Sequence, residues 1–421
     1  MAYTRRIIDD VIDDLLPDLP AISIDGPKAI GKTATAKQRA SEVLHLDDPA
    51  TAQLLLAGPE RIATYNRPLL LDEWQRIPQI WDQVRRLVDE DPTGGRFILT
   101  GSAIPMNAPV HSGAGRIVQL RMRPLAVAER GIETPTVRLS DLISGNAQID
   151  GRTKVGLADY IREIVASGFP AIRPLNGRAR RIQLDGYIER AIQRDIPEMG
   201  KTVRLPQQVR RWLAAYAAAS SSTASYALIG RTAYADGATP SRDTIVTYRE
   251  ALSHLWLLDQ VPAWTTGHNN FTKQALAPKH FLADPALSAR LLNLDEERLL
   301  RAQSPADFEP QDGTILGALF EALVALSLQT YAAANDAQLS HYRNTPGTHE
   351  IDFIVHRGDD DIVAFEVKLA KAPDKDAVKH LLWMKEQLGS KLKDMVLITS
   401  GSDAYRRQDG VAVVPLALLG H

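Results

Sequence analysis

The sequence predicts an α/β protein with three parts in chain order: an amino-terminal parallel sheet, a central helical region and a carboxyl-terminal α/β domain. Short apolar strands alternate with helical runs over the first 135 residues, which is typical of a parallel sheet covered on both faces. Helical patterns dominate up to about residue 265, and two strand patterns joined by a turn lie near residue 360. Because 421 residues exceed the size at which one hydrophobic core keeps growing, we expect several domains.

The composition is that of an ordinary soluble globular protein, with 44% hydrophobic and 24% charged residues. The sequence contains no cysteine, which excludes disulfides, thiolate nucleophiles and cysteine-ligated zinc. A net charge of −2 argues neither for nor against nucleic acid. No segment is expected to span a membrane, and the acidic residues of the first twenty positions are not typical of a secretory signal. We therefore expect a cytoplasmic protein without a membrane partner.

A glycine-containing loop between a strand and a helix is the first motif that carries chemistry. Residues 21–25 are predicted as a buried strand and residues 34–44 as a helix. The loop between them fits G-x-x-x-x-G-K-[ST], whose backbone N–H groups and helix N-terminus point together at phosphates. Lys32 is expected to reach the β- and γ-phosphates of ATP, and Thr33 to hold Mg²⁺. The predicted nucleotide-binding residues are Gly26, Pro27, Lys28, Ala29, Ile30, Gly31, Lys32 and Thr33.

An apolar run that ends in two carboxylates, residues 68–73, predicts the second half of an ATPase site. Asp72 would bind the Mg²⁺ shell, and Glu73 would polarise the attacking water. The alternative is a buried strand that meets solvent at an acidic turn. Beside a phosphate loop this becomes the less favoured interpretation.

A third apolar strand, residues 96–102, ends in hydroxyl groups instead of acids. Thr100 or Ser102 fits a sensor position near the γ-phosphate. The loop 112–116 follows and ends in Arg116, which is either a charge-stabilising finger, in its own subunit or in a neighbouring one, or a surface arginine. Spacing alone gives the two interpretations about equal weight.

Nine segments together resemble bacterial AAA-type ATPases that carry a carboxyl-terminal domain of unknown function. That family is similar to the archaeal and STAND-like ATPase groups, and a winged-helix segment and a restriction-endonuclease-like domain follow its ATPase domain. The resemblance implies an ATPase domain over 1–135, a helical linker over 136–205, a winged-helix-like domain over 206–265 and a nuclease-like domain over 270–421. Many relatives carry arginine at the position of Lys28. The segments are GPKAIGKT, LLLDEWQRIP, FILTGS, SGAGRIVQLRMRPLAVAE, IQRDIPEM, LAPKHFLADPAL, LGALFEALV, HEIDFIV and AFEVKLA.

The middle of the chain has a strong local charge asymmetry. Residues 173–211 carry nine arginines and one lysine against four acids, a local net charge of +6. Such a stretch either contacts phosphates of DNA or RNA or forms solvated helix faces between domains, and the second interpretation is the more common one.

Residues 207–264 predict three helices followed by a strand, which is the spacing of a helix-turn-helix with a wing. The helices are expected at 209–219, at 226–233 and after Ser241, which would cap the third. Arg242 and Arg249 would lie on the exposed side of that helix, and residues 256–264 would form the wing. DNA contact and a lid or partner surface stay equally open.

The strands 350–356 and 361–369 are joined by Arg357-Gly358-Asp359-Asp360 and predict an antiparallel hairpin. A turn centred near residue 359 would set Asp352 across from Glu366, and Glu350 across from Lys368. Period-two alternation places these four side chains on one face.

An aspartate followed by Glu-x-Lys on the next strand resembles the PD-(D/E)XK nuclease core. This resemblance implies that Asp352 and Glu366 ligate Mg²⁺ or Mn²⁺, that Glu321 on the preceding helix completes the shell, and that Lys368 orients water. The alternative is a solvated hairpin face with Glu–Lys pairs.

The leading functional hypothesis is an ATP-binding protein, a Mg²⁺-dependent ATPase, whose nucleotide state moves a winged helix and a nuclease-like domain on or near nucleic acid. The alternative is an ATP-controlled regulator or toxin-like interaction protein whose nuclease-like domain is inactive. A helicase or loader ranks lower because only the two ATPase motifs are present. Partners other than ATP, including DNA, RNA, a protein or further copies of the chain, stay open.

Overall fold

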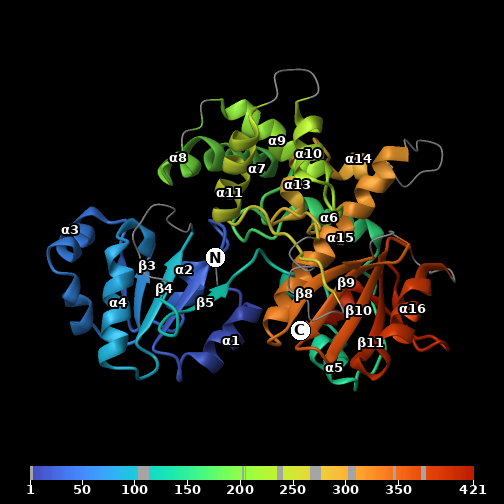
Figure 1. Ribbon diagram of the computed structural model, residues 1–421, viewed down its shortest axis with the longest axis horizontal. Helices are drawn as coiled ribbons and strands as arrows, with labels where there is room; N and C mark the ends of the chain where they lie inside the picture. The colour runs from blue at the N-terminus through green and yellow to red at the C-terminus, as the bar shows by residue number, and fades with distance from the viewer. Residues whose placement is uncertain are drawn as a thin grey trace. The chain divides into compact units, whose positions relative to one another are not determined.

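The computed structural model describes residues 3–102, 113–201, 203, 205–234, 240–265, 276–301, 310–344, 348–370 and 376–421 (Figure 1). The chain forms two compact units, and each is built from separate stretches of sequence. The first comprises Met1–Pro124, Glu189–Arg204 and Val246–Leu257, and the second comprises Leu125–Ile188, Leu205–Ile245 and Leu258–His421. The four-segment division of the sequence stays a prediction.

A five-stranded sheet forms the centre of the first unit, with the strand order β2-β3-β4-β1-β5. Every neighbouring pair is parallel, as predicted. β4 lies between β1, which precedes the phosphate loop, and β3, which carries the paired acids. Because the three strands are parallel, their carboxyl ends lie at the same edge of the sheet. The strands are β1 (Ala21–Asp25), β2 (Glu42–His45), β3 (Leu69–Asp72), β4 (Phe97–Gly101) and β5 (Val118–Arg121).

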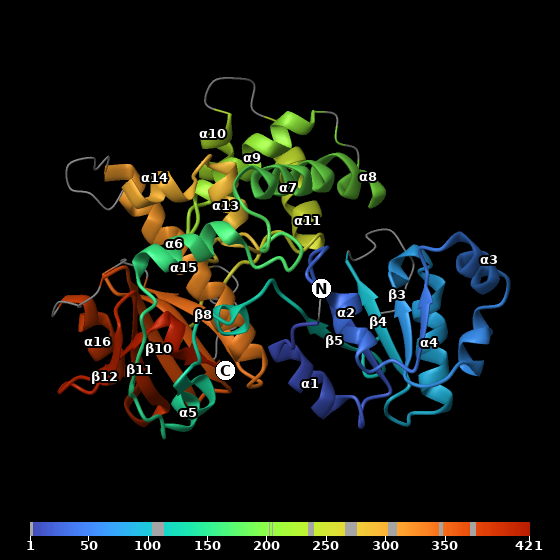
Figure 2. The same ribbon diagram turned by 180° about the vertical axis from the view of Figure 1, so that it is seen from behind.

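Helices flank this sheet, and both views place α1 on the side of β5 and α3 on the opposite side (Figures 1 and 2). The helix predicted over 34–44 is too long. It ends at Lys37, and Glu42–His45 is a strand because Val43 and Leu44 pair with Leu70 and Leu71 of β3. Pairing with the sheet therefore overrides the helical pattern. The helices are α1 (Ile7–Leu15), α2 (Lys32–Lys37), α3 (Pro49–Ala57), η1 (Pro59–Thr64), η2 (Trp74–Arg76), α4 (Gln79–Glu90), η4 (Ala191–Asp195) and α8 (Ile196–Glu198).

A mixed sheet forms the centre of the second unit, with the order β7-β12-β13-β11-β10-β9-β8. β9 and β10 form the predicted antiparallel hairpin, and β11 continues the sheet parallel to β10. A separate short pair joins β6 to β14. The strands are β6 (Val137–Arg138), β7 (Gly151–Arg152), β8 (Gln338–Arg343), β9 (Glu350–Arg357), β10 (Asp361–Lys368), β11 (Leu392–Thr399), β12 (Asp403–Arg406), β13 (Ala412–Pro415) and β14 (Leu419–Gly420).

Helices pack against this sheet, and the middle of the chain adds further helices to the second unit. Leu381 and Met384 of α16 are buried in one cluster with Ile354, Ile362 and Ala364. The helices are η3 (Val127–Arg130), α5 (Leu139–Ser144), α6 (Leu157–Ala166), α7 (Gly177–Arg190), α9 (Pro206–Ala218), α10 (Tyr226–Ala233), α11 (Arg242–His254), α13 (Pro285–Leu291), α14 (Glu296–Arg301), α15 (Pro310–Ala333), η5 (Asp376–Val378), α16 (Lys379–Leu388), η6 (Gly389–Lys391) and η7 (Leu416–Leu418).

Helix α15 corrects one expectation about the sequence. Its segment 315–333 is long and apolar enough to cross a membrane by length and composition, although no such segment was expected. However, 72% of its most apolar window is buried inside the fold, as in the core helix of a soluble protein. Its apolar character is therefore explained by burial, while the cellular location stays a prediction.

The three helices of the predicted winged helix are present. Ser241 accepts the Thr244 N–H at 3.2 Å and caps α11, as expected. However, α9 and α10 belong to the second unit, whereas residues 246–257 belong to the first. The described part of the predicted wing forms isolated bridges at Leu258, Val261 and Ala263, with no strand between 256 and 264. The structure thus shows no winged-helix unit among the described residues.

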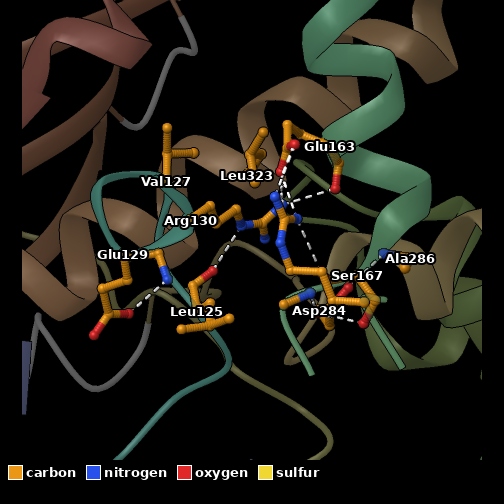
Figure 3. A network of polar contacts seen from close by, with 12 residues as sticks. Leu125, Val127, Glu129, Arg130, Glu163, Ser167, Asp284, Ala286 and Leu323 are labelled. Atoms are coloured by element: carbon orange, nitrogen blue, oxygen red, sulfur yellow. Dashed lines mark hydrogen bonds and ion pairs between the residues drawn. The ribbon is translucent and has the colours of Figure 1, made fainter. Parts of the chain in front are cut away.

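A buried ionic network lies within the first segment of the second unit and joins η3 to α6 (Figure 3). The guanidinium of Arg130 donates to the Leu125 carbonyl at 2.9 Å and to the Glu163 carboxylate at 3.1 Å. Arg173 binds both oxygens of the same carboxylate, at 2.6 and 2.9 Å. Nearby, the buried Asp284 accepts the Gly168 N–H at 2.6 Å and the Ser167 hydroxyl. Arg130 and Arg173 therefore share the Glu163 carboxylate, while Asp284 is held by neutral donors.

Candidate functional site

The phosphate loop follows β1 and precedes α2, as predicted. Its backbone needs glycine at the first position, because a Cβ at Gly26 would lie 2.3 Å from the Met122 carbonyl oxygen. Gly31, just before α2, has a φ of 101°, which side chains disfavour. The Arg6 guanidinium donates to the carbonyl of Ile30, in the loop, at 3.0 Å. It also donates to the carbonyl of Arg123, just after β5, at 2.8 Å, and so ties the loop to that segment. Protein groups thus contribute to the shape of the loop.

Lys32 is buried and folds back over the loop. Its Nζ donates to the carbonyls of Gly26 at 2.9 Å and Pro27 at 2.7 Å. Burial lowers the pKa of this ammonium to about 8, although Glu73, Asp25 and Asp72 act in the opposite direction. A phosphate group would offer this cation a charged partner in place of two neutral carbonyls.

Asp72 receives hydrogen bonds from three directions. The Thr33 hydroxyl donates to Oδ1 at 2.7 Å, and the Thr100 hydroxyl makes a short hydrogen bond to the same oxygen. His45 Nδ1 lies 2.9 Å from Oδ2. A carboxylate and a threonine hydroxyl in direct contact are the two protein ligands expected of a Mg²⁺ ion on ATP. The strand ends therefore bring together the residues that the two sequence motifs named.

Glu73 follows Asp72 in a left-handed conformation, with a φ of 56°. Its Oε2 accepts hydrogen bonds from Gln75 Nε2 at 2.6 Å and from the Ser102 hydroxyl at 3.1 Å. Strain of this kind costs about 1–3 kcal/mol and is found where a side chain must be aimed at a site. The Ser102 hydroxyl, just after β4, thus binds the Glu73 carboxylate, while the Thr100 hydroxyl donates to Asp72 and accepts the Glu73 N–H at 3.4 Å.

Arg116 lies away from these groups. Its Nε donates to Asp89 Oδ1 at 2.7 Å in the last turn of α4, and it precedes β5 at the amino end of that strand. The phosphate loop and Asp72 lie at the carboxyl ends of their strands. The amino and carboxyl ends of parallel strands lie on opposite sides of the sheet. Arg116 therefore does not reach phosphates bound in its own unit. Ser112, where the predicted loop begins, lies outside the described residues.

Lys28, at the third position of the loop, pairs with a carboxylate from a distant segment. Its Nζ lies 2.6 Å from Oδ1 of Asp195, whose side chain is 8% exposed. A cavity of about 100 Å³ lies beside this pair, and Gln75, Ser102 and Glu198 also line it. The segment 189–204 therefore borders the groups that surround Glu73.

Sequence reasoning missed His45, Gln75 and Asp195 as parts of this site. Gln75 lies two residues after Glu73, and the motif LLLDEWQRIP contains it. The segment IQRDIPEM contains Asp195, but spacing gives no reason to place it at the loop. The position of His45 beside Asp72 depends on the pairing of β2 with β3, which sets these two residues opposite each other.

In the second unit, the hairpin register agrees with the prediction. Phe353 pairs with Phe365, and the next step of the ladder sets Asp352 across from Glu366. Burial, followed by repulsion from Asp352, raises the pKa of Glu366 to about 9. The side chains of Asp352 and Glu366 are 15% and 5% exposed, whereas those of Glu350 and Lys368 are 39% and 43% exposed, so this hairpin face is solvated only in part. Lys368 Nζ lies 3.2 Å from Glu366 Oε2.

Lys279 is a member of this cluster that sequence reasoning did not name. Its Nζ lies 2.6 Å from Glu321 Oε1 and 3.1 Å from Asp352 Oδ1. Burial, followed by the charge of Asp352, raises the pKa of Glu321 to about 7. Among the described residues, no group of three or more histidine, aspartate or glutamate side chains is arranged to hold a metal ion. Of the three predicted ligands, Glu321 and Asp352 therefore contact one ammonium group, while Glu366 pairs with Lys368.

The basic stretch 173–211 is partly neutralised within the fold. Arg173 pairs with Glu163, Arg194 with Glu198 and Arg210 with Asp185. On α11, Arg242 is exposed, whereas Arg249 is half-buried. The available positive charge is therefore smaller than the local sequence count.

Three protein families match successive parts of the chain. Residues 18–130 match an AAA domain. Residues 157–298 and 316–419 match two domains of unknown function, DUF8612 and DUF4143. The AAA match indicates ATP binding and hydrolysis and makes Mg²⁺ the expected metal. The resemblance to AAA-type ATPases with a carboxyl-terminal domain of unknown function is confirmed at this level, while a winged helix, a nuclease core and nucleic-acid binding are not shown.

Similar whole proteins leave the function open. Two uncharacterized proteins, of Mycobacterium tuberculosis and Mycobacterium bovis, are each 25% identical to this chain over 404 residues, which cover 94% of this chain and 80% of theirs. Among solved structures, a Walker-type ATPase of Pyrococcus abyssi has a TM-score of 0.40 and 13% identity, and the comparison covers 69% of this chain and 96% of that one.

Proposed function

We propose that this chain is a Mg²⁺-dependent ATPase that uses its phosphate loop, Asp72 and Glu73. The observation that carries the proposal is the contact between Thr33 and Asp72, whose oxygens lie 2.7 Å apart at the carboxyl edge of the sheet. A Mg²⁺ ion that takes both oxygens as ligands would bridge the protein and the phosphates, and Lys32 would balance their charge.

Glu73 is assigned the role of orienting and polarising the attacking water. Its carboxylate is held by Gln75 and Ser102 at the strand ends, next to the proposed metal ligand Asp72. Thr100 would sense the metal through Asp72, whereas Ser102 would sense the water position through Glu73. Arg116 is retained as a finger only for the site of a neighbouring copy, since its own site lies at the opposite sheet edge.

We further propose that the nucleotide state changes the position of the segment 189–204. Lys28 pairs with Asp195, and phosphate oxygens would compete for this ammonium. A second contact of the same unit joins Arg121, at the end of β5, to the ring of Trp256 at 4.8 Å. Both distant segments of the first unit therefore contact residues near the nucleotide site.

The test measures phosphate release from ATP by the full-length protein with Mg²⁺ and with excess chelator. Asp72→Asn is expected to lower the rate by roughly 10²-fold or more, because it weakens the metal site. The matched control is Asp47→Asn, which changes an exposed carboxyl just beyond β2. Hydrolysis that persists in Asp72→Asn, or that does not need Mg²⁺, would refute the assignment.

Action on nucleic acid stays a prediction. It rests on the residual positive charge of 173–211 and on Arg242, and it predicts weak duplex binding that strengthens as salt falls. Binding that is absent at low salt, or unchanged by salt, would favour the alternative in which ATP controls contacts with a protein partner. The buried Lys279 favours that alternative for the carboxyl-terminal domain, because it occupies the cluster that cleavage would need.

A further inference from the structure

The carboxylate cluster of the second unit has a cation at its centre. Lys279 Nζ donates to Glu321 on α15 and to Asp352 on β9, and it lies 3.9 Å from Glu350 Oε1. The Lys279 side chain is 1% exposed, so water contributes little to its solvation. Three carboxylates from two elements therefore share one ammonium group from a third segment.

The backbone fixes Lys279 in this position. Its N–H donates to the Val261 carbonyl at 2.9 Å, and its carbonyl accepts the Val261 N–H at 3.0 Å. Nζ also lies 5.3 Å from the ring centroid of Phe353, a distance at which the ring stabilises a cation. The next residue, His280, is held by the Ala224 carbonyl, 2.8 Å from Nε2. The ammonium is therefore a built part of the cluster and not a surface group that has folded inward.

We propose that Lys279 is the resident cation of this cluster and that it excludes a divalent ion from the carboxylates of the carboxyl-terminal domain. A Mg²⁺ ion needs oxygen ligands at about 2.0–2.1 Å in near-octahedral geometry. An ammonium group 2.6 Å from Glu321 and 3.1 Å from Asp352 fills the space between these oxygens. A second cation there would meet like-charge repulsion, and withdrawal of Lys279 would leave a buried charge without partners.

Two consequences follow. The wild-type domain does not carry out metal-dependent hydrolysis at these residues, and its function is expected to depend on contacts with other molecules. Removal of the Lys279 charge, by contrast, leaves the carboxylates of Glu321 and Asp352 close together with no cation between them. Such a variant is expected to acquire a divalent-ion site.

The experiment counts bound Mn²⁺ by electron paramagnetic resonance in the full-length protein without nucleotide. Lys279→Met, which keeps the length of the apolar stem, should bind one ion more per chain than wild type below ~1 mM Mn²⁺. Adding Asp352→Asn to that variant should remove the extra ion, and Lys279→Arg, which keeps a cation, should behave as wild type. Mn²⁺ should also raise the melting temperature of Lys279→Met by more than that of wild type.

Two results would overturn the proposal: a wild-type Mn²⁺ ion that Asp352→Asn removes, or a folded Lys279→Met that gains none. Should Lys279→Met fail to fold by circular dichroism, the variant with Lys279→Met and Glu321→Gln loses one charge of each sign and is tested in the same way. If neither variant folds, the comparison of wild type with Asp352→Asn decides. Equal Mn²⁺ counts support the proposal and a loss refutes it.

Discussion

Lys28 and Asp195 are 167 positions apart in the chain, yet Nζ and Oδ1 lie 2.6 Å apart beside the phosphate loop. The Asp195 side chain is 8% exposed and that of Lys28 is 32% exposed. The ion pair therefore stabilises the charge of the carboxylate more than the charge of the ammonium group. The pair joins a residue of the phosphate loop to the segment 189–204.

We expect a double-mutant cycle on Lys28→Ala and Asp195→Ala to give a coupling energy of roughly 0.5–3 kcal/mol in the nucleotide-free protein, because the two groups contact directly. Denaturant unfolding of the four proteins measures it. With a saturating, non-hydrolysable ATP analogue the coupling should fall, since phosphates compete for Lys28. A coupling that the analogue leaves unchanged would argue against the proposed switch.

Lys32→Ala should lower the ATPase rate by roughly 10²–10³-fold, because it removes the buried cation that the loop aims at the phosphates. A fluorescent ATP analogue measures binding, and phosphate release measures turnover. Arg86→Ala, which removes an exposed cation of α4, is the control and should behave as wild type. Normal turnover in Lys32→Ala would mean that the site lies elsewhere.

Glu73→Gln should keep ATP bound while slowing hydrolysis by roughly 10²–10⁴-fold, since Asp72 still holds the metal and water activation is lost. Single-turnover measurements separate the two steps. Glu60→Gln changes an exposed carboxyl of the same unit and serves as control. Failure of Glu73→Gln to bind ATP would show that this residue shapes the fold instead.

Asp25 predicts a pH dependence of stability. Burial raises its pKa to about 6, against the opposing effects of the Ser23 hydroxyl and Lys32. The folded protein therefore holds this proton more tightly than the unfolded chain, so the contribution of Asp25 to the free energy of unfolding falls as pH rises from about 4 to about 6 and is level above that.

Asp25→Asn removes this linkage. Its free energy of unfolding relative to wild type should rise across the same interval, by roughly 3 kcal/mol at most. Denaturant titrations without nucleotide at several pH values measure the difference, with the exposed Asp18→Asn as control. A difference that is constant with pH would contradict the assignment.

Glu163→Gln should lower the free energy of unfolding by about 3 kcal/mol, because Arg130 and Arg173 would lose their shared anion and Arg130 is fully buried. Glu297→Gln breaks an exposed pair with Arg301 and should change stability by less than about 0.5 kcal/mol. Chemical denaturation of both variants provides the comparison. Equal effects would mean that the network in Figure 3 adds little stability.

The sequence predicted the elements whose pattern is local. β1, the hairpin of β9 and β10, and the cap of α11 by Ser241 agree with the structure, since each depends on neighbouring residues. The end of α2 was misplaced because the pairing of β2 with β3 joins segments far apart in sequence.

The candidate sites show the same limit. Thr33 and Asp72 come from motifs with a known spatial relationship, so their contact was predictable. Lys279 and Asp195 each join a site from a segment without such a motif, and only the folded chain brings them there. The cluster of acids was therefore predicted as a metal site, although its central cation is a side chain.

The short pair of β6 with β14 has a consequence for biosynthesis. Thr136 donates its N–H to the Leu418 carbonyl, and Val137 pairs with Leu419, so this edge cannot form until residue 419 has left the ribosome. The five strands β1 to β5 are complete by Arg121 and can pair much earlier. Val137 would then wait, during translation, for a partner that is almost three hundred positions away, whereas Arg130, Glu163 and Arg173 of the same segment can pair as soon as Arg173 has emerged.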